Sequence, residues 1–306
     1  MKESIRHKAI ELGAYRSGFA LAQKVSGEAA ALYRRWIDAG CHGEMAYCAK
    51  YLDERDDPRL LLDGARTVIS CAFPYAARHP GPIASYAYGE DYHYWVKDRL
   101  KRLGQWVEEN YGGSTRACVD TAPIRERYWA QQAGIGFVGV NNQLIIPGAG
   151  SRFFLGELLW TGAVDPDEPC TLTCGGCQAC VRACPGSALD GFGGCDARRC
   201  VSYLTIEHRG PLPAGANLGG MLYGCDSCLD ACPHCGQASR AISEEAISEI
   251  SELLEVSKKA DNSDIAHMTS SHYRKLVAHS AMRRVPLAQL LRNAEWINSQ
   301  TESDTQ

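Results

Sequence analysis

The chain has 306 residues, of which 45% are hydrophobic and 22% are charged, and its formal net charge at pH 7 is −4. This length allows one large domain or two to three smaller ones with real cores. No run of eighteen apolar residues occurs, which excludes a membrane span, and the charged N-terminus does not resemble a secretion signal. The net charge excludes a uniformly basic coat for nucleic acid, but not a local basic patch. Because neither a membrane span nor a secretion signal is predicted, we expect a cytoplasmic protein.

The first part of the chain alternates between helical and strand patterns. An amphipathic helix is predicted at residues 3–13, and a short strand follows at residues 17–22. Residues 67–73 (TVISCAF) are β-branched and apolar, which predicts a buried strand. Residues 92–113 carry apolar side chains at helical spacing and end in two glycines, so we expect a helix there.

Asp120 lies at the end of the next predicted strand, residues 116–120. A helix is expected at residues 127–134, and residues 136–160 have the glycine-punctuated pattern of strand, turn and strand. Because strands and helices alternate over the first 165 residues, we predict a layered α/β or α+β domain. Asp120 could act as an acid or could cap the helix that follows it, a role that aspartate often fills.

A cysteine-rich region begins after this domain. Of the fifteen cysteines, eleven lie between Cys170 and Cys235, and in a reducing compartment such crowding indicates metal binding and not disulfides. Residues 174–185 (CGGCQACVRACP) have the C-x2-C-x2-C-x3-C-P spacing of bacterial iron–sulfur proteins, in which the fourth cysteine binds a second cluster. Residues 223–233 (YGCDSCLDACP) supply three more cysteines. Zinc is the alternative metal, because it also binds C-x2-C pairs.

Eight of these cysteines complete two [4Fe–4S] clusters. The first set is Cys174, Cys177, Cys180 and Cys232. The second set is Cys184, Cys200, Cys225 and Cys228. Three cysteines remain, each of which could be a free thiol or an alternative ligand: Cys170, Cys195 and Cys235. The preference for Cys200 over Cys195 depends partly on the family resemblance described below.

The rest of the chain is predicted to be helical, with helices at residues 243–256 and 287–297 and a frayed end at residues 299–306. Charges in this tail run from acidic to basic, a pattern that usually marks solvated helix faces. The sequence contains neither the glycine pattern of a dinucleotide-binding turn nor a P-loop. Two clusters joined to a large additional domain therefore predict electron transfer within the chain.

Four segments, in order, resemble the epoxyqueuosine reductase family, which comprises cobalamin-dependent iron–sulfur enzymes of tRNA modification. They are residues 119–159, 174–185, 196–213 and 223–233, and residues 83–103 are similar as well. The resemblance runs from near residue 1 to about residue 297. Many relatives continue into a helical-repeat segment that helps to bind tRNA, and we expect this chain to be a shorter form without it.

The resemblance implies a fold and a domain organisation. Residues 1–165 would form a nitroreductase-like α/β (α+β) domain that binds cobalamin and carries out catalysis. Residues 166–240 would form a ferredoxin-like module with two [4Fe–4S] clusters, and residues 241–306 a helical C-terminal segment. We expect a monomer without membrane attachment.

The resemblance also implies a reaction, namely the reduction of epoxyqueuosine to queuosine at the wobble position of tRNA. Cobalamin as Co(I) would be the reductant, and the clusters would supply it with electrons from an external low-potential donor. Asp120 matches the acid of the family and is predicted to protonate the departing oxygen. This role implies a pKa raised by burial and by the apolar face of the cofactor.

Base-off cobalamin, without a protein ligand to cobalt, is expected for the family. The predicted cobalamin contacts match family motifs: Tyr86, Asp91, Tyr92, His93, Asn142, Ser151, Phe153, Ser202 and His208. Cys71 and Cys118 could also approach the cofactor, although both fit the pattern of small buried residues. The predicted contacts to tRNA phosphates are Arg125, Arg127, Arg198, Arg199, Arg209 and the basic residues 274–292.

Two other functions fit the same cofactors. A reductive dehalogenase would use cobalamin and the two clusters, but such enzymes typically carry a twin-arginine export signal, which the N-terminal residues lack. An electron carrier of the ferredoxin type would use the clusters alone and would need no cobalamin. If the bound metal is zinc, the alternative prediction is an RNA-binding module with structural zinc.

Overall fold

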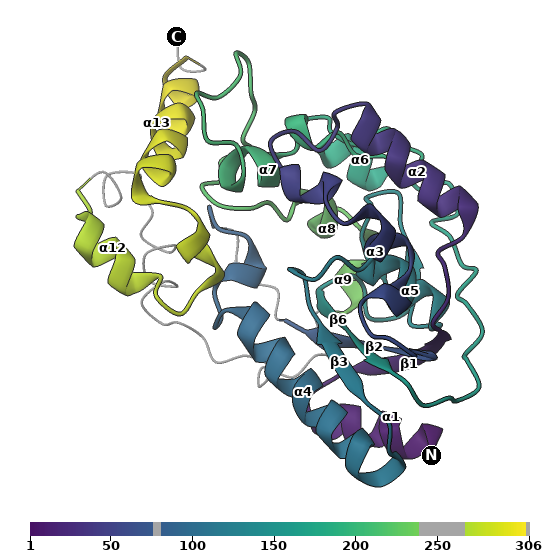
Figure 1. The fold of residues 1–306 in the computed structure, drawn as a ribbon. Helices are drawn as coiled ribbons and strands as arrows, with labels where there is room; N and C mark the ends of the chain where they lie inside the picture. The colour runs from purple at the N-terminus through teal and green to yellow at the C-terminus, as the bar shows by residue number, and fades with distance from the viewer. Residues whose placement is uncertain (76–80, 239–266, 304–306) are drawn as a thin grey trace.

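The computed structural model describes residues 1–75, 81–238 and 267–303. Its centre is a four-stranded antiparallel sheet with the order β1-β2-β6-β3 (Figure 1). The strands are β1 (Arg16–Leu21), β2 (Thr67–Pro74), β3 (Thr115–Cys118) and β6 (Phe153–Trp160). β2 is buried along its whole length, as its uninterrupted apolar pattern predicts. In the register, Glu157 of β6 lies between Ser70 of β2 and Cys118 of β3.

Helices cover both faces of this sheet, which confirms the mixed α/β prediction. On one face lie α1 (Lys2–Glu11) and α4 (Tyr92–Tyr111), whose apolar side chains pack on Ile69, Phe73 and Leu158. On the other face lies α5 (Glu126–Gln132), which buries Trp129 and Ala130 against Val68 and Leu159. Outside this layer are α2 (Gly27–Asp38) and α3 (Leu52–Asp56).

Short helices and turns form the cysteine-rich region. Its helices are α6 (Ala179–Ala183), α7 (Val201–Ile206), α8 (Ser227–Asp230) and α9 (Pro233–Ala238). A small hairpin of β4 (Phe137–Val138) and β5 (Leu144–Ile145) packs against it through Phe137, which lies in one cluster with Leu229 and Cys232. The region therefore shares a core with the α/β part of the chain.

The C-terminal helices α12 (Ser270–Leu276) and α13 (Leu287–Ser303) share a core with Ile83, Ala87 and Tyr88, which precede α4, and with Ile206 of α7 (Figure 1). The predicted frayed end is wrong as far as residue 303, because α13 continues to Ser303. Two side chains on its last turns hold it: Trp296 and Gln300 both donate hydrogen bonds to the carbonyl of Ala216, at 2.8 and 2.6 Å. The helix predicted at residues 243–256 lies outside the described residues.

Other sequence predictions differ from the structure in small but useful ways. The strand predicted at residues 116–120 ends at Cys118, because Asp120 adopts a left-handed backbone conformation with φ of 40°. The predicted helix 127–134 corresponds to α5, and Gly134 follows it with φ of 71°, as expected of a glycine after a helix. Among the described helices, none is both long enough and apolar enough to cross a membrane.

The close contact of β1 with the end of α5 gives a test of the packing. A Cβ atom at Gly18 would lie 1.9 Å from the carbonyl oxygen of Ala133, so we expect Gly18→Ala to destabilise the protein by about 2 kcal/mol. Gly27, in the first turn of α2, has no atom within 4 Å of such a Cβ and provides the matched control. Gly27→Ala should be neutral or stabilising by up to about 1 kcal/mol. Anaerobic urea denaturation of both variants measures the difference, and equal stabilities would contradict this account of the contact.

Candidate active site and cluster sites

A cavity of about 540 Å³ opens between the α/β layers, the cysteine-rich region and the C-terminal helices. Several residues predicted from the sequence meet in its wall: Tyr86, Tyr92, His93, Asp120, Cys200 and Ser202. They come from four separate parts of the chain. The structure therefore brings the predicted acid, part of the predicted cobalamin contacts and one predicted cluster ligand to the same space.

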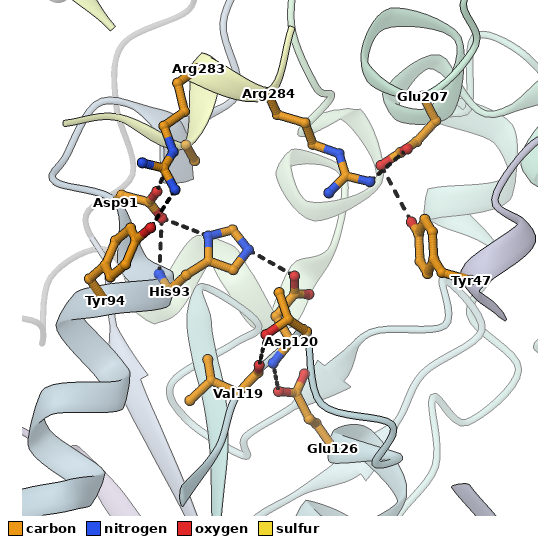
Figure 2. A network of polar contacts seen from close by, with 12 residues as sticks. Tyr47, Asp91, His93, Tyr94, Val119, Asp120, Glu126, Glu207, Arg283 and Arg284 are labelled. Carbon is orange, nitrogen blue, oxygen red and sulfur yellow. Dashed lines mark hydrogen bonds and ion pairs between the residues drawn. The ribbon is translucent and has the colours of Figure 1, made fainter. Parts of the chain in front are cut away.

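Asp120 occupies the turn between β3 and α5. Its backbone N–H donates a hydrogen bond of 2.6 Å to the Glu126 carboxylate, and its side chain is 46% exposed (Figure 2). The helix-cap alternative is wrong, because Arg125 occupies the N-cap position of α5. The expected burial of Asp120 is also not observed: its carboxyl group faces the cavity and is held by a histidine.

That histidine is His93, in the first turn of α4. Its Nδ1 lies 2.6 Å from Oδ1 of Asp91, and its Nε2 lies 2.8 Å from Oδ2 of Asp120 (Figure 2). Burial alone would lower the pKa of His93, but hydrogen bonds and charges from Asp120 and Asp91 raise this pKa to about 9. The imidazole is therefore a cation at neutral pH, between two carboxylates.

Asp91 fixes this arrangement from the other side. It is the N-cap of α4, where its side chain accepts the backbone N–H of His93 at 3.1 Å. Burial would raise the pKa of Asp91, but hydrogen bonding to His93 and the charge of His93 hold it below its ordinary value. Nε of Arg283 lies 3.3 Å from the second carboxylate oxygen of Asp91, and Arg283 also donates to the Tyr94 hydroxyl at 2.6 Å.

Two further carboxyl groups lie behind Asp120. Glu157 is fully buried in the centre of the sheet, where the Ser70 hydroxyl donates to it at 3.1 Å. Burial, followed by the nearby charge of Glu126, raises the pKa of Glu157 well above its ordinary value. Burial, followed by the charge of Asp120, likewise raises the pKa of Glu126. These two groups therefore favour protonation beneath the charged pair of His93 and Asp120.

The opposite wall of the cavity contains Tyr47 and Glu207, which carry no sequence motif, and Arg284, one of the basic residues 274–292 predicted to contact phosphates. Glu207 accepts a hydrogen bond from the Tyr47 hydroxyl at 3.4 Å and pairs with Arg284 at 2.9 Å (Figure 2). The guanidinium group of Arg284 lies over the Tyr47 ring, 5.6 Å from its centroid. Because these residues are far apart in sequence and have no motif in common, only the tertiary structure shows that they form one group in the cavity wall.

Aromatic stacking supports the part of the cavity wall that contains Tyr92 and His93. The Tyr92 ring stacks on Phe154, with centroids 4.4 Å apart and 3° between the planes, and on His93 at 4.0 Å. Phe153, the predicted contact, faces the other side of β6, where its ring lies 5.3 Å from that of Tyr15. Neighbouring residues of a strand point to opposite faces, so Phe154 and not Phe153 contributes to this wall.

Four other predicted cobalamin contacts also lie outside the cavity lining, and one of them is Asp91, which is engaged with His93 and Arg283. Both ring nitrogens of His208 are engaged, Nδ1 with Glu44 at 2.7 Å and Nε2 with the carbonyl of Pro211 at 2.8 Å. Ser151 is buried next to Gly150, which packs against Cys235. Asn142 turns the chain with φ of 58°, and its neighbour Gln143 lines the cavity instead.

The first predicted cluster set gathers around a hollow of its own. Its four cysteines, Cys174, Cys177, Cys180 and Cys232, line this hollow together with residues of the β4–β5 hairpin. The Cys174 sulfur accepts a hydrogen bond of 3.4 Å from the backbone N–H of Val140. The four thiols, although distant in sequence between Cys180 and Cys232, therefore surround one space.

In the second set, Cys184, Cys200, Cys225 and Cys228, the side chains of Cys200 and Cys225 pack against one core cluster. Burial, followed by the charges of Cys225, Cys200, Cys184 and also Cys180 of the first set, raises the pKa of Cys228. Cys195 lies beside this set, hydrogen-bonded to Cys200. Cys235 and Cys170 lie near the first set, in the core cluster that contains Cys232 and Cys174. Within the described residues, no three His, Cys, Asp or Glu side chains converge on a position for a single metal ion.

The predicted phosphate contacts differ in their availability. Arg125 is largely buried, pairs with Asp56 and stacks on the Tyr33 ring, which leaves it engaged within the fold. Arg127 donates to the carbonyl of Asn142, and Arg209 to the Gln289 side chain. Arg198 pairs with Asp196 at 2.8 Å but is exposed, as is Arg199.

Comparisons with known proteins agree with these observations. Residues 55–121 match a family model described as "Epoxyqueuosine reductase QueG, DUF1730", and residues 173–235 match a "4Fe-4S double cluster binding domain". The second match makes the cysteine-rich region a 4Fe-4S cluster-binding domain and favours iron–sulfur over zinc.

The chain is 37% identical to the epoxyqueuosine reductase of Leadbetterella byssophila over 303 residues, which cover 96% of this chain and 97% of that protein. It is 41% identical to the Vibrio cholerae epoxyqueuosine reductase over 247 residues, covering 76% and 66% of the two chains.

Solved structures give the same result. An epoxyqueuosine reductase bound to an epoxyqueuosine-modified stem loop of tRNA-Tyr is similar with a TM-score of 0.81, at 26% identity over 96% of this chain and 79% of that chain. The Streptococcus thermophilus epoxyqueuosine reductase has a TM-score of 0.77, at 30% identity over 96% and 80% of the two chains. This chain, with its cavity, its polar groups around His93 and its cluster-binding region, belongs to the epoxyqueuosine reductase family of oxidoreductases.

Proposed function

We propose that this protein reduces epoxyqueuosine at the wobble position of tRNA to queuosine, with cobalamin and two [4Fe–4S] clusters as its cofactors. The observation that carries the proposal is the linked series Asp91–His93–Asp120, which ends in a cavity also lined by the cluster ligand candidate Cys200. A protein that only carries electrons would not need the linked groups of Asp91, His93 and Asp120 to transfer protons. The family membership and the relative bound to a modified tRNA stem loop favour this substrate over a halogenated one.

The proposed roles of the three parts of the chain follow the predicted domains. Residues 1–165 form the cobalamin-binding catalytic domain, for which we propose a nitroreductase-like fold, and residues 166–240 form the ferredoxin-like double-cluster module. The third part is the C-terminal segment, residues 241–306, whose described residues contain α12 and α13. The cavity lies where these three parts meet, because its lining includes Asp120, Cys200 and Arg284.

The residues of the cavity fit base-off cobalamin. Tyr86, Tyr92 and Met45 present broad apolar surface for a flat macrocycle. His93, which lines the cavity, has both nitrogens occupied by carboxylates and is not available as a cobalt ligand. Cobalamin, when bound, would supply the two-electron reductant for the epoxide.

The eight cysteines fit two clusters of four thiolates each. Cys174, Cys177, Cys180 and Cys232 would hold the cluster that is distant from the cavity. Cys184, Cys200, Cys225 and Cys228 would hold the cluster at the cavity wall, where Cys200 is part of the lining. An external low-potential donor would reduce the pair.

Protons reach the substrate through Asp120. Removal of the epoxide oxygen as water consumes two electrons and two protons and leaves a carbon–carbon double bond. Asp120 presents its carboxyl group to the cavity and contacts His93, so a proton lost from Asp120 can be replaced from the imidazolium. Asp91 and Arg283 keep the imidazole oriented during this exchange.

Glu126 positions Asp120. Residue 120 has a left-handed backbone that is unfavourable for aspartate, and the hydrogen bond from its N–H to Glu126 stabilises that turn. In the Bacillus subtilis epoxyqueuosine reductase, which is 25% identical with a TM-score of 0.81, a catalytic aspartate loop is swung out of the active site. We infer that the loop of Asp120 has the same freedom and that Glu126 holds it in place.

Replacement of Asp120 by asparagine tests the proton-donor role. Asp120→Asn should retain iron and cobalamin but reduce turnover by about 10²- to 10⁴-fold, the usual contribution of a general acid. The measurement is anaerobic incubation with dithionite and epoxyqueuosine-containing tRNA, followed by mass spectrometry of the nucleosides. Full activity of this variant would refute the role, and an inactive wild-type protein would refute the proposed reaction.

Replacement of Glu126 tests its positioning role. Glu126→Ala should lower kcat by about 10- to 100-fold with little change in KM, since the acid is misplaced and not removed. Glu126→Gln should stay within about threefold of wild type, because its amide oxygen still accepts the Asp120 N–H. Glu28→Ala, an exposed glutamate in the first turn of α2, is the matched control and should behave as wild type. A loss of activity in Glu126→Gln as large as in Glu126→Ala would contradict a role in hydrogen bonding.

The raised pKa of His93 predicts a pH-dependent contribution to stability. Its folded pKa of about 9 lies above the ordinary value of 6.5, so the stabilisation is fully present below pH 6.5 and is lost as the pH rises through 9. It cannot exceed about 3 kcal/mol, and partial exposure of the ring reduces it by solvent screening. Urea denaturation of wild type and His93→Gln should show a difference that shrinks between pH 6.5 and pH 9.5. A constant difference over this range would exclude a charged His93.

A further inference from the structure

Phe192 is the most exposed of the large apolar side chains in the described part of the chain, at 94%. It stands at the tip of a short hairpin, residues 189–195, whose ends pair at Leu189 and Cys195. The Asp190 carboxylate accepts the backbone N–H groups of Phe192 at 2.7 Å and of Gly194 at 2.9 Å. Because the tip is held in this way, a partner that covers the ring need order little of the chain.

The hairpin is attached to the loop that carries the first cluster set. Gln178, between Cys177 and Cys180, donates its side-chain amide to the carbonyl of Gly191 at 3.0 Å. Leu172, two residues before Cys174, is a second exposed apolar side chain, at 56%. Gly175 and Gly176 are exposed as well, with open space around them. The first cluster set is therefore close to the surface beside these two apolar side chains.

The two cluster sets differ in what they face. Cys200 of the second set lines the cavity with Asp120, whereas the hollow of the first set shares none of its lining residues with that cavity as described. The substrate enters the cavity under the proposed function. Electrons from outside therefore have their entrance at the other end of the pair, at the first set.

Exposed positive charge accompanies the apolar side chains. Residues 171–199 contain three arginines and two aspartates, a net charge of +1. Asp190 is used within the hairpin, and Asp196 is paired with Arg198. Arg182, one turn after Gln178 on α6, and Arg199 are exposed. This surface favours a negatively charged partner, because complementary charge accelerates association.

We propose that Leu172, Phe192, Arg182 and Arg199 form a docking surface for an acidic, low-potential one-electron carrier protein. The proposal rests on the proposed function. Aromatic side chains and arginines are both enriched in protein interfaces, and a small contact area is typical of transient electron-transfer complexes. Each encounter would transfer one electron from the carrier to the cluster held by the first cysteine set. Two encounters and two protons serve each epoxide, whose oxygen leaves as water.

The test compares a protein donor with a chemical donor. Phe192→Ala and Arg182→Glu are each mixed anaerobically with a reduced acidic flavodoxin, and bleaching of the iron–sulfur absorbance gives the rate of electron transfer. We expect each variant to lower the second-order rate constant by about tenfold, with retained iron content, and unchanged rates and turnover with dithionite. Leu60→Ala removes an equally apolar, 60% exposed side chain elsewhere and should leave both rates unchanged.

Each other outcome overturns the docking proposal. If flavodoxin reduces the Phe192 and Arg182 variants as fast as wild type, the surface is not the entrance. If the variants instead raise the KM for tRNA with dithionite as donor, Phe192 contacts RNA. Failure of the proposed function is distinguishable, because wild-type protein would then leave epoxyqueuosine unchanged with dithionite while flavodoxin still bleached its clusters.

Discussion

The site depends on one imidazole held between two carboxylates. His93 connects Asp91, at the start of α4, with Asp120, in the turn after β3. Arg283, from the C-terminal part of the chain, pairs with Asp91 and so brings a third segment into the same network. Each contact is charge-assisted, and such hydrogen bonds are stronger and shorter than neutral ones. The relative positions of α4, the β3–α5 turn and the C-terminal helices are therefore coupled at this point.

The same network explains why Glu126 and Glu157 can remain in the interior. An ionised carboxylate without a partner is costly to bury, and such a group becomes protonated instead. Glu157 accepts a hydrogen bond from one hydroxyl group, that of Ser70, and no cation among the described residues contacts it. Because His93 neutralises much of the charge of Asp120, Glu126 lies next to an ion pair and not next to an isolated anion. It can then accept the hydrogen bond from the Asp120 N–H.

How much the sequence predicts depends on how local the signal is. Spacing alone predicts that Cys174, Cys177 and Cys180 belong to one cluster, since they lie within seven residues, whereas the choice of Cys200 depends partly on the family resemblance. The buried strand β2 is predicted from its apolar run. Asp120 could be placed at the end of a strand, but not its left-handed backbone, which follows from tertiary contacts. Glu207 carries no local signal, and Arg284 is predicted only as part of a basic run, because their pairing arises where distant segments meet. Phe153 matches the family motif but faces away from the cavity wall, because neighbouring residues of a strand point to opposite faces and a motif match does not resolve which face a side chain takes.

Under the proposed function, electrons and protons would reach the cavity through different parts of the chain. Cys200 belongs to the cysteine-rich region, whereas His93 and Asp120 belong to the α/β part of the chain. A negatively charged cluster close to Asp120 would raise the free energy of the carboxylate that remains after proton transfer. The imidazolium of His93 opposes this effect, because it is adjacent to the new charge and can return a proton. The separation of the two paths, with the cation on the proton side, would therefore let a reductant collect negative charge while Asp120 can still give up its proton.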